Sequence, residues 1–179
     1  MKKAVFLDRD GVINEVLTDR VKFVNKPHEL YFLPGVPEAI KKLNTVFDFI
    51  FVVTNQGGVG LGYMKEAQLQ KIHDHMIAAL KKEGATIHEV AYCPHKPKAG
   101  CDCRKPNSKL ITDLGKKYNI DLSHSYMVGD TDTDIIAGKK AGTKCVFLGK
   151  NDPLSDAVFL DLITAVDWII EDAAASIEG

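Results

Sequence analysis

The stretch AVFLDRDG, residues 4–11, decides how the rest of the sequence is interpreted. Residues 4–8 have the apolar character of a short buried strand, and the acidic residues Asp8 and Asp10 stand at its end. Side chains two positions apart on an extended segment point to the same side, so these two carboxylates can share a ligand. A pair of solvated aspartates in a turn is the other interpretation, and this stretch alone favours neither.

Short apolar runs and helical patterns alternate along the rest of the chain. Strand-like runs are expected at 49–54, 86–92, 125–130, 144–148 and 166–170. Helical patterns are expected over 35–47, 65–82 and 132–141, after a predicted cap at Asn107, and at the end of the chain. Such alternation implies a mostly parallel sheet with helices on both faces. We therefore expect a single α/β domain of the Rossmann-like type over residues 1–179.

Polar residues follow several of these apolar runs, where ligands bind in parallel sheets. They are Asp8, Asp10, Thr54, Asn55, Gln56, Lys105, Asp130 and Asp134. Two carboxylates about 5 Å apart repel each other by roughly 3 kcal/mol at an effective dielectric constant near 20, so clustered aspartates need cations. Oxygen ligands favour Mg²⁺, and Lys105 adds a further positive charge. The Thr54 hydroxyl and the Lys105 amine both suit phosphoryl oxygens, which predicts magnesium-dependent phosphoryl transfer.

Other ion and phosphate motifs fail on spacing. A calcium loop needs glycine at its sixth position, where the two acidic segments have Ile13 and Ile135. The glycine-rich segment GGVGLGY, residues 57–63, matches neither a dinucleotide fingerprint nor a P-loop. No cysteine is followed by arginine six positions later, as the loop of a cysteine phosphatase requires. None of these three alternative motifs is therefore expected in this chain.

Three of the four cysteines lie in the segment CPHKPKAGCDC, residues 93–103. The two pairs Cys93-x-His95 and Cys101-x-Cys103 can close into one tetrahedral set around Zn²⁺. A disulfide framework is the alternative, which a reducing compartment disfavours. A structural zinc would fix the direction in which the next residues, Arg104 and Lys105, project. Zinc then shapes the loop and takes no part in the reaction.

Four segments resemble, in order, the motifs of the haloacid dehalogenase (HAD) superfamily of phosphatases: FLDRDG, VVTNQ, CRKP and GDTDTD. The resemblance implies that Asp8 attacks phosphorus and becomes an aspartyl phosphate. Asp10 would protonate the leaving oxygen and then activate water.

The same resemblance implies roles for the remaining strand-end residues. Thr54 and Lys105 would hold the phosphoryl group. Mg²⁺ would be bound by Asp8, Asp130 and the backbone carbonyl of Asp10. For Asp134 two interpretations stay open, a second acidic site residue or a charge that stabilises a helix N-terminus.

The zinc segment followed by RKP resembles the family of D-glycero-D-manno-heptose 1,7-bisphosphate 7-phosphatases and histidinol-phosphate phosphatases. This implies a domain without a large cap, whose site is covered by the loops 14–26, 57–64 and 94–104. It also implies substrate contacts from Asp19, Asn55, Gln56, Gly57 and Arg104. The expected reaction is removal of the C7 phosphate of the heptose bisphosphate. Histidinol phosphate, or another sugar or nucleic-acid-end phosphate, is the alternative substrate, and Thr131 replaces a lysine found in many heptose enzymes.

Charge and hydropathy limit the partners that we expect. The net charge of −1 comes without a basic tract, so no nucleic acid is expected. The sequence has neither a signal-peptide pattern nor an apolar run long enough for a membrane, so we expect a cytoplasmic protein. We expect a monomer or weak dimer, and the resemblance implies a small sugar phosphate as its substrate. A zinc-stabilised binding module with a vestigial site is the non-enzymatic alternative. Among the histidines, His73 and His75 are expected to be solvated on the helix 65–82.

Overall fold

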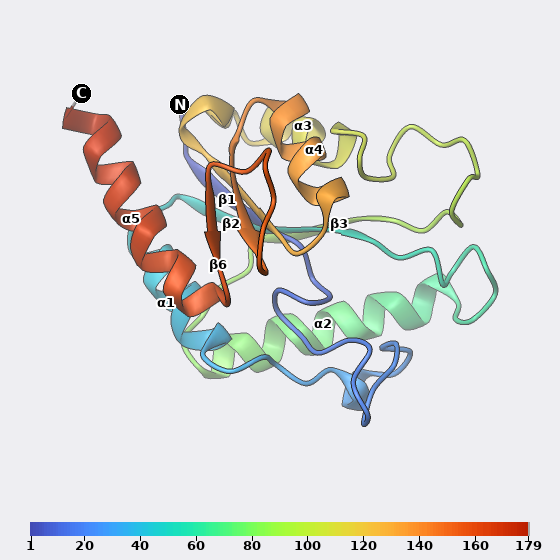
Figure 1. The fold of residues 1–179 in the computed structure, drawn as a ribbon. Helices are drawn as coiled ribbons and strands as arrows, with labels where there is room; N and C mark the ends of the chain where they lie inside the picture. The colour runs from blue at the N-terminus through green and yellow to red at the C-terminus, as the bar shows by residue number, and fades with distance from the viewer. Residues whose placement is uncertain (179) are drawn as a thin grey trace.

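The computed structural model describes residues 1–178; Gly179, the end of the predicted domain, lies outside them (Figure 1). The helices are α1 Val36–Asn44, α2 Glu66–Lys82, α3 Lys109–Lys117, α4 Asp132–Ala141 and α5 Leu162–Glu178, with short 3-10 helices at Pro27–Glu29 and Leu122–His124. The strands are β1 Ala4–Leu7, β2 Phe49–Asn55, β3 Glu89–Cys93, β4 Tyr126–Gly129, β5 Lys144–Leu148 and β6 Ala157–Phe159.

All strand pairs are parallel, in the order β3-β2-β1-β4-β5-β6, which confirms the predicted fold class. Strand β1 lies at the centre, and its last residue, Leu7, pairs with Val52 on one side and Val128 on the other. The carboxyl ends of β1, β2 and β4 therefore lie at the same edge of the sheet. That edge carries the polar residues that follow these strands.

Helices cover both faces of the sheet. Helices α1, α2 and α5 lie on one face, and α3 and α4 lie on the other (Figure 1). Successive side chains of β1 alternate between the two layers: Val5 and Leu7 join the core under α1, α2 and α5, while Ala4 and Phe6 join the core under α3 and α4. Both faces are thus buried, which is why these strands read as unbroken apolar runs.

One expectation about the end of the chain and one about a helix cap were wrong. Residues 166–170 lie inside helix α5, where Val166 and Ile169 are buried at helical spacing. The sixth strand is β6, whose three residues are too few to give a pattern. The N-cap of α3 is Ser108 instead of Asn107, whose side-chain nitrogen contacts the carbonyl of Cys101 at 3.5 Å.

The connection between β1 and α1 holds only loops and the 3-10 helix Pro27–Glu29, so no large cap is inserted there. Among the described residues, no helix combines the length and the apolar character that crossing a membrane would require.

Candidate active site

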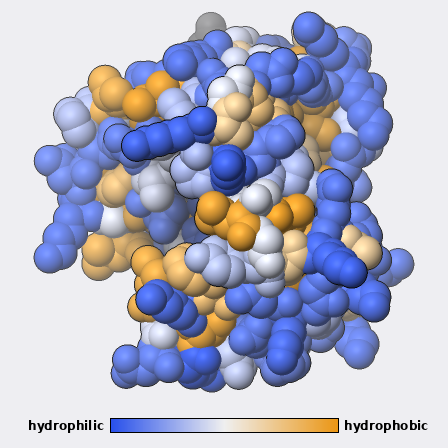
Figure 2. Space-filling model, turned by 90° about the vertical axis from the view of Figure 1, so that its right-hand side faces the viewer, coloured by the Kyte–Doolittle hydropathy of each residue, from blue (hydrophilic) through white to orange (hydrophobic). Residues whose placement is uncertain are grey.

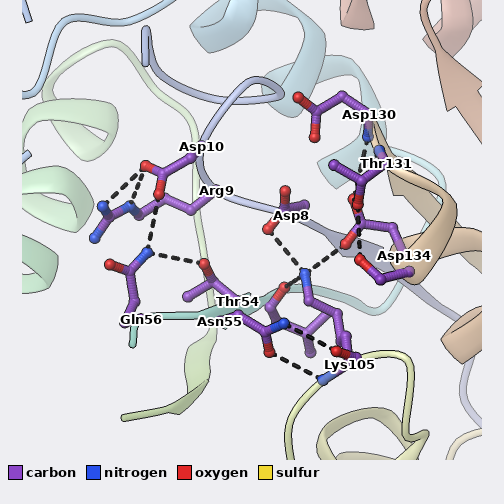
Figure 3. A network of polar contacts seen from close by, with 12 residues as sticks. Asp8, Arg9, Asp10, Thr54, Asn55, Gln56, Lys105, Asp130, Thr131 and Asp134 are labelled. Atoms are coloured by element: carbon purple, nitrogen blue, oxygen red, sulfur yellow. Dashed lines mark hydrogen bonds and ion pairs between the residues drawn. The ribbon is translucent and has the colours of Figure 1, made fainter. Parts of the chain in front are cut away.

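The strand-end residues from four parts of the chain meet at the carboxyl edge of the sheet (Figure 3). Asp8 follows β1, Thr54 lies near the end of β2 and Asp130 follows β4. Lys105, which follows the cysteine segment, reaches into the same place and is buried. The structure therefore brings together the residues that the sequence placed at separate strand ends.

The amine of Lys105 makes three hydrogen bonds, which use all of its donors. Its Nζ lies 2.9 Å from Oδ1 of Asp8, 2.6 Å from Oδ1 of Asp134 and 2.9 Å from the carbonyl oxygen of Val53. Burial lowers the pKa of Lys105, but the two carboxylates outweigh burial and raise this pKa to about 12. The lysine is therefore charged at any pH at which the protein would work.

Asp8, Asp130 and Asp134 form a group of carboxylates, and one oxygen of each lies within 4.8 Å of one oxygen of the other two. Oxygens around an octahedral Mg²⁺ at about 2.1 Å lie roughly 3.0 to 4.2 Å apart, so small adjustments suffice. Burial, and then the charge of Asp134, raise the pKa of Asp130 to about 6. Burial also raises the pKa of Asp8 well above its usual range, against the influence of Lys105. One lysine does not balance three carboxylates, so the donor set suits a divalent cation.

Two further observations favour a cation beside Asp130. Its Oδ1 atom is buried without a hydrogen-bond partner in the described part of the chain. A Cβ atom at Gly11 would lie 1.9 Å from its Oδ2 atom, and Gly11 has a φ of +84°. Glycine is therefore required beside the carboxylate, both for its backbone conformation and for the space.

Asp134 serves two purposes in this arrangement. Its Oδ2 accepts hydrogen bonds from the backbone nitrogens of Asp130 and Thr131, at 3.2 Å each, and from Oγ1 of Thr131 at 2.9 Å. Its Oδ1 pairs with Lys105. The residue thus stabilises the N-terminus of α4 and fixes Lys105, and both of its oxygens are engaged.

The side chain of Asp10 points away from the carboxylate group, toward Arg9 and Gln56 (Figure 3). Oδ1 accepts three hydrogen bonds, from Nε and Nη2 of Arg9 at 3.1 and 2.9 Å and from Nδ2 of Asn14 at 2.9 Å. Oδ2 accepts one, from Nε2 of Gln56 at 3.2 Å. Burial raises the pKa of Asp10, but the charge of Arg9 and these hydrogen bonds outweigh it, so the pKa lies below its usual value.

The β2 end supplies three more of the predicted residues. Oγ1 of Thr54 accepts a hydrogen bond from Nε2 of Gln56 at 3.0 Å, which leaves the hydroxyl hydrogen free for another acceptor. Asn55 binds the backbone of Lys105 on both sides: its Nδ2 donates to the carbonyl at 3.1 Å, and its Oδ1 accepts from the backbone nitrogen at 2.9 Å. Both polar atoms of the Asn55 side chain are therefore bonded to the backbone of Lys105.

A cavity of about 680 Å³ opens beside Asp10 and the β2 end. It is lined by Arg9, Asp10, residues 20–25, Glu29, residues 55–58, Leu61, Tyr63, Met64 and Pro97. These include parts of the three loops that were expected to cover the site. Figure 2 looks onto this loop side and shows apolar patches among charged residues; Phe23 and Tyr63 contribute exposed apolar side chains. A volume of this size accommodates a small molecule.

The two remaining predicted substrate residues differ in placement. Arg104 lines a second, smaller cavity together with Lys105, and its Nη1 donates to the carbonyl of His95 at 3.3 Å. Asp19 is exposed and lines neither cavity. The neighbouring Arg20 does line the larger one, where its guanidinium pairs with Glu15 and lies 3.7 Å above the ring of Tyr31.

The four predicted zinc ligands converge, and all of the cysteines are free thiols. Sγ of Cys93 lies 3.6 Å from Sγ of Cys101 and 3.0 Å from Sγ of Cys103. Nδ1 of His95 lies 3.4 and 3.2 Å from the sulfurs of Cys93 and Cys103. Thiolates bound to a tetrahedral zinc at about 2.3 Å lie roughly 3.8 Å apart, so the group needs only slight expansion to hold the ion.

The cysteine segment also supports the loop that lines the larger cavity. The backbone nitrogen of Gly60 donates to the carbonyl of Pro94 at 2.8 Å, and that of Gln56 donates to the carbonyl of Cys93 at 2.8 Å. A Cβ atom at Gly60 would lie 2.5 Å from the backbone nitrogen of Lys96. The two loops therefore pack backbone against backbone.

Sequence reasoning missed the residues that surround Asp10. Arg9 is almost fully buried, and His73 is buried beside it, which contradicts the expected solvation of this histidine. His75 is exposed, as expected. A signal was available, because His73 stands four positions after Leu69 and three before Met76, both on the buried face of α2.

Comparisons with known proteins agree with this geometry. Residues 102–162 match the model of a HAD-hydrolase-like family. D-glycero-alpha-D-manno-heptose-1,7-bisphosphate 7-phosphatase of Photorhabdus laumondii is 34% identical, over 94% of this chain and 97% of its own. The D-glycero-beta-D-manno-heptose-1,7-bisphosphate 7-phosphatase of Pseudomonas aeruginosa is 32% identical, over 95% and 99%.

A solved structure has the same architecture. The crystal structure of D,D-heptose 1,7-bisphosphate phosphatase from Bordetella bronchiseptica, complexed with magnesium and phosphate, superposes with a TM-score of 0.84. It shares 32% sequence identity, and the match covers 95% of this chain and 99% of that one.

Proposed function

Because this chain belongs to the D-glycero-D-manno-heptose-1,7-bisphosphate 7-phosphatase family of HAD-like hydrolases, we propose that it removes the C7 phosphate of a heptose 1,7-bisphosphate. The relatives are phosphatases, and HAD phosphatases use Mg²⁺. The observation that carries the proposal is the convergence of Asp8, Lys105 and Asp130 at the edge of the sheet. The neighbouring Asp10 and Gln56 line a cavity of small-molecule size. The names of the relatives include both anomers, so the proposal leaves the anomer open.

In the proposed reaction, Asp8 is the nucleophile. Its Oδ1 is held by Lys105, so Oδ2 attacks phosphorus while the bond from phosphorus to the sugar oxygen breaks. The free hydroxyl hydrogen of Thr54 binds an oxygen of the phosphoryl group, and the nearby charge of Lys105, whose three donors are engaged, stabilises that group electrostatically. Mg²⁺, when bound, neutralises the carboxylates and the phosphoryl oxygens. We assign its ligands as Asp8, Asp130 and the Asp10 carbonyl, as the resemblance to HAD phosphatases implies, and we assign to Asp134 the two roles described above.

Asp10 acts first as the general acid and then as the general base. Its Oδ1 is saturated by three N–H donors, so Oδ2 is the oxygen that carries the proton to the leaving alkoxide. Because its pKa is lowered, Asp10 is mostly ionised in the free enzyme, and only its protonated fraction acts as the acid. The ionised carboxylate then accepts a proton from the water that attacks the aspartyl phosphate. This second displacement releases phosphate and restores Asp8.

We also propose that Zn²⁺ occupies the group formed by Cys93, His95, Cys101 and Cys103 as a structural ion. All four ligand positions come from protein, which leaves no open position for a substrate. The contacts of this segment with the 56–60 loop and the nearby Arg104 support a role in shaping the substrate cavity. We propose substrate contacts from Gln56, Gly57 and Arg104.

The deciding experiment compares kcat/KM for heptose 1,7-bisphosphate, as each anomer, with that for histidinol phosphate in the presence of Mg²⁺. We expect a preference of at least about a hundredfold for one heptose anomer. A preference for histidinol phosphate would reject the substrate but keep the mechanism. Full activity of Asp8→Asn would reject the mechanism.

The last part of the proposal concerns the location of the protein in the cell and its oligomeric state. We propose a cytoplasmic location and a monomer or weak dimer. Gel filtration with light scattering at several protein concentrations tests the assembly, and a stable higher oligomer would contradict it.

A further inference from the structure

Arg9 is a buried cation whose hydrogen bonds go in two directions. Nε and Nη2 bind Oδ1 of Asp10, and Nη1 lies 3.0 Å from Nε2 of His73 on helix α2. Arg9 and His73 are each only 1% exposed. Burying a guanidinium is costly unless its donors find acceptors. His73 supplies the acceptor for the part of the guanidinium that faces away from Asp10.

The contact fixes the protonation state of His73. The guanidinium has only donors, so Nε2 of His73 must accept and cannot carry a hydrogen. The imidazole is therefore neutral, with its hydrogen on Nδ1. Burial, with the nearby charge of Arg9, lowers the pKa of His73 to about 3, which agrees with this assignment. The ring lies 5.8 Å from that of Tyr92 on β3, so the histidine is held between helix and sheet.

On the proposed function, we infer that His73 is a positioning residue for proton transfer: it orients Arg9, and Arg9 holds Asp10 so that Oδ2 faces the reacting oxygen. The chain of contacts runs from the helix to the carboxylate without a gap. His73 itself does not line the substrate cavity, whereas Arg9 and Asp10 do. Losing the acceptor would leave Nη1 unpaired, and the guanidinium would turn toward another acceptor and release Oδ1.

Leaving-group dependence separates this role from a structural one. Phenyl phosphate and 4-nitrophenyl phosphate have similar shapes, but the phenolate needs a proton from Asp10 far more than the nitrophenolate does. Values of kcat/KM report the step that forms the aspartyl phosphate, in which that proton is transferred. A badly placed acid therefore lowers the ratio of phenyl to 4-nitrophenyl phosphate, while a general loss of folded protein leaves the ratio unchanged.

The experiment measures this ratio, with Mg²⁺, in the wild type, Asp10→Asn, His73→Leu, His73→Gln and Ile72→Val. We expect His73→Leu to lower the ratio about tenfold, in the direction of Asp10→Asn. His73→Gln retains an acceptor oxygen and should keep the ratio within about twofold of the wild type. Ile72 is buried on the same helix, so Ile72→Val controls for lost packing and should also keep the ratio. If His73→Leu does not fold, His73→Phe replaces it, since it keeps a ring and removes the acceptor.

The outcomes distinguish this inference from the function on which it rests. If Asp10→Asn lowers the ratio but His73→Leu lowers both substrates equally or neither, the positioning role is overturned while the phosphatase mechanism stands. An effect of His73→Gln as large as that of His73→Leu would also overturn it, because the acceptor would then be irrelevant. If the wild type releases no phosphate, or Asp10→Asn leaves the ratio unchanged, the proposed mechanism fails and the inference falls with it.

Discussion

Lys105 donates a hydrogen bond of 2.9 Å to Oδ1 of Asp8, although 97 positions separate the two residues in the chain. The contact joins the central strand to the loop that follows the cysteine segment. It leaves one oxygen of Asp8 held and the other free. Because the lysine also pairs with Asp134, two buried carboxylates share one cation at the centre of the site.

Replacing Lys105 by methionine should lower both activity and stability. Methionine keeps most of the unbranched side chain but leaves Asp8 and Asp134 buried without their cation, which costs about 3 to 5 kcal/mol in the free energy of unfolding. Loss of a charge that stabilises the transition state should lower kcat by about 10² to 10³. Urea unfolding and phosphate release measure the two effects, and Mg²⁺ should restore part of the stability.

Lys109→Met is the matched control for this prediction. Lys109 pairs with Asp113 at 2.8 Å, but both side chains are about half exposed, so the pair contributes little. Its loss should leave the free energy of unfolding nearly unchanged. Equal destabilisation by the two variants would show that burial does not govern the Lys105 contacts.

Gly11→Ala tests whether the space beside Asp130 is needed for the metal. The new Cβ would lie 1.9 Å from Oδ2 of Asp130, so the carboxylate must move. We expect the Mg²⁺ concentration that gives half-maximal activity to rise at least about tenfold, by analogy with the loss of other ligand-orienting contacts. Titration of activity against Mg²⁺ measures the shift.

Gly142→Ala is the control that separates the effect of the clash at Gly11 from the effect of backbone strain. Gly142 has a φ of +92°, similar to that of Gly11, but a Cβ atom there would meet nothing within 4 Å. Both variants should lose roughly 1 kcal/mol of stability from the left-handed backbone. Only Gly11→Ala should change the Mg²⁺ dependence, and an equal change in Gly142→Ala would refute the steric explanation.

The strands and their ends could be predicted because burial on both faces leaves a strong local pattern. Four apolar runs identified β1, β2, β4 and β5, and the parallel topology then placed Asp8 beside Asp130. Residues 166–170 were misassigned because a short apolar run fits a strand and a helix equally well. The wider spacing of Leu162, Val166 and Ile169 is helical, and it would have decided the assignment.

The surroundings of Asp10 could be predicted only in part. The sequence shows that Asp10 stands two positions after Asp8, but it does not show the direction of the Asp10 side chain, because that direction depends on partners far apart in the chain. His73 lies 64 positions from Arg9, and its burial depends on how α2 packs on the sheet. His73 is buried, although solvation was expected, because it lies on the same face of α2 as the buried Leu69 and Met76.

Removal of one zinc ligand should loosen the cysteine segment without removing the aspartate site. Cys101→Ser should reduce the zinc content from about one ion per chain and raise KM more than it lowers kcat, because Arg104 and the 56–60 loop rest on this segment. Metal analysis and steady-state kinetics check this. Cys145→Ala removes a buried thiol outside the group and should keep the zinc. Zinc content unchanged in Cys101→Ser would contradict the assignment.

Stability should depend on pH through Asp172, which lies far from the site in the interface between α5 and β5. Its Oδ2 accepts hydrogen bonds from the hydroxyl of Tyr126 and from Nζ of Lys144, the latter at 2.6 Å. Burial raises the pKa of Asp172, but these two partners outweigh it, so the pKa is lowered in the folded protein. The carboxylate therefore contributes stability above its unfolded pKa of about 3.9, and this contribution is lost as the pH falls through the lower folded pKa.

Asp172→Asn removes that contribution. At pH 7 the variant should be about 1 kcal/mol less stable than the wild type, and the difference should shrink below about pH 4, where the wild-type carboxylate also becomes neutral. Asp167→Asn is the control, because Asp167 is mostly exposed and lies 3.5 Å from Lys42. Urea unfolding at several pH values gives both differences. A difference for Asp172→Asn that stayed constant between pH 3 and pH 7 would mean that packing, not charge, sets the contribution of this residue.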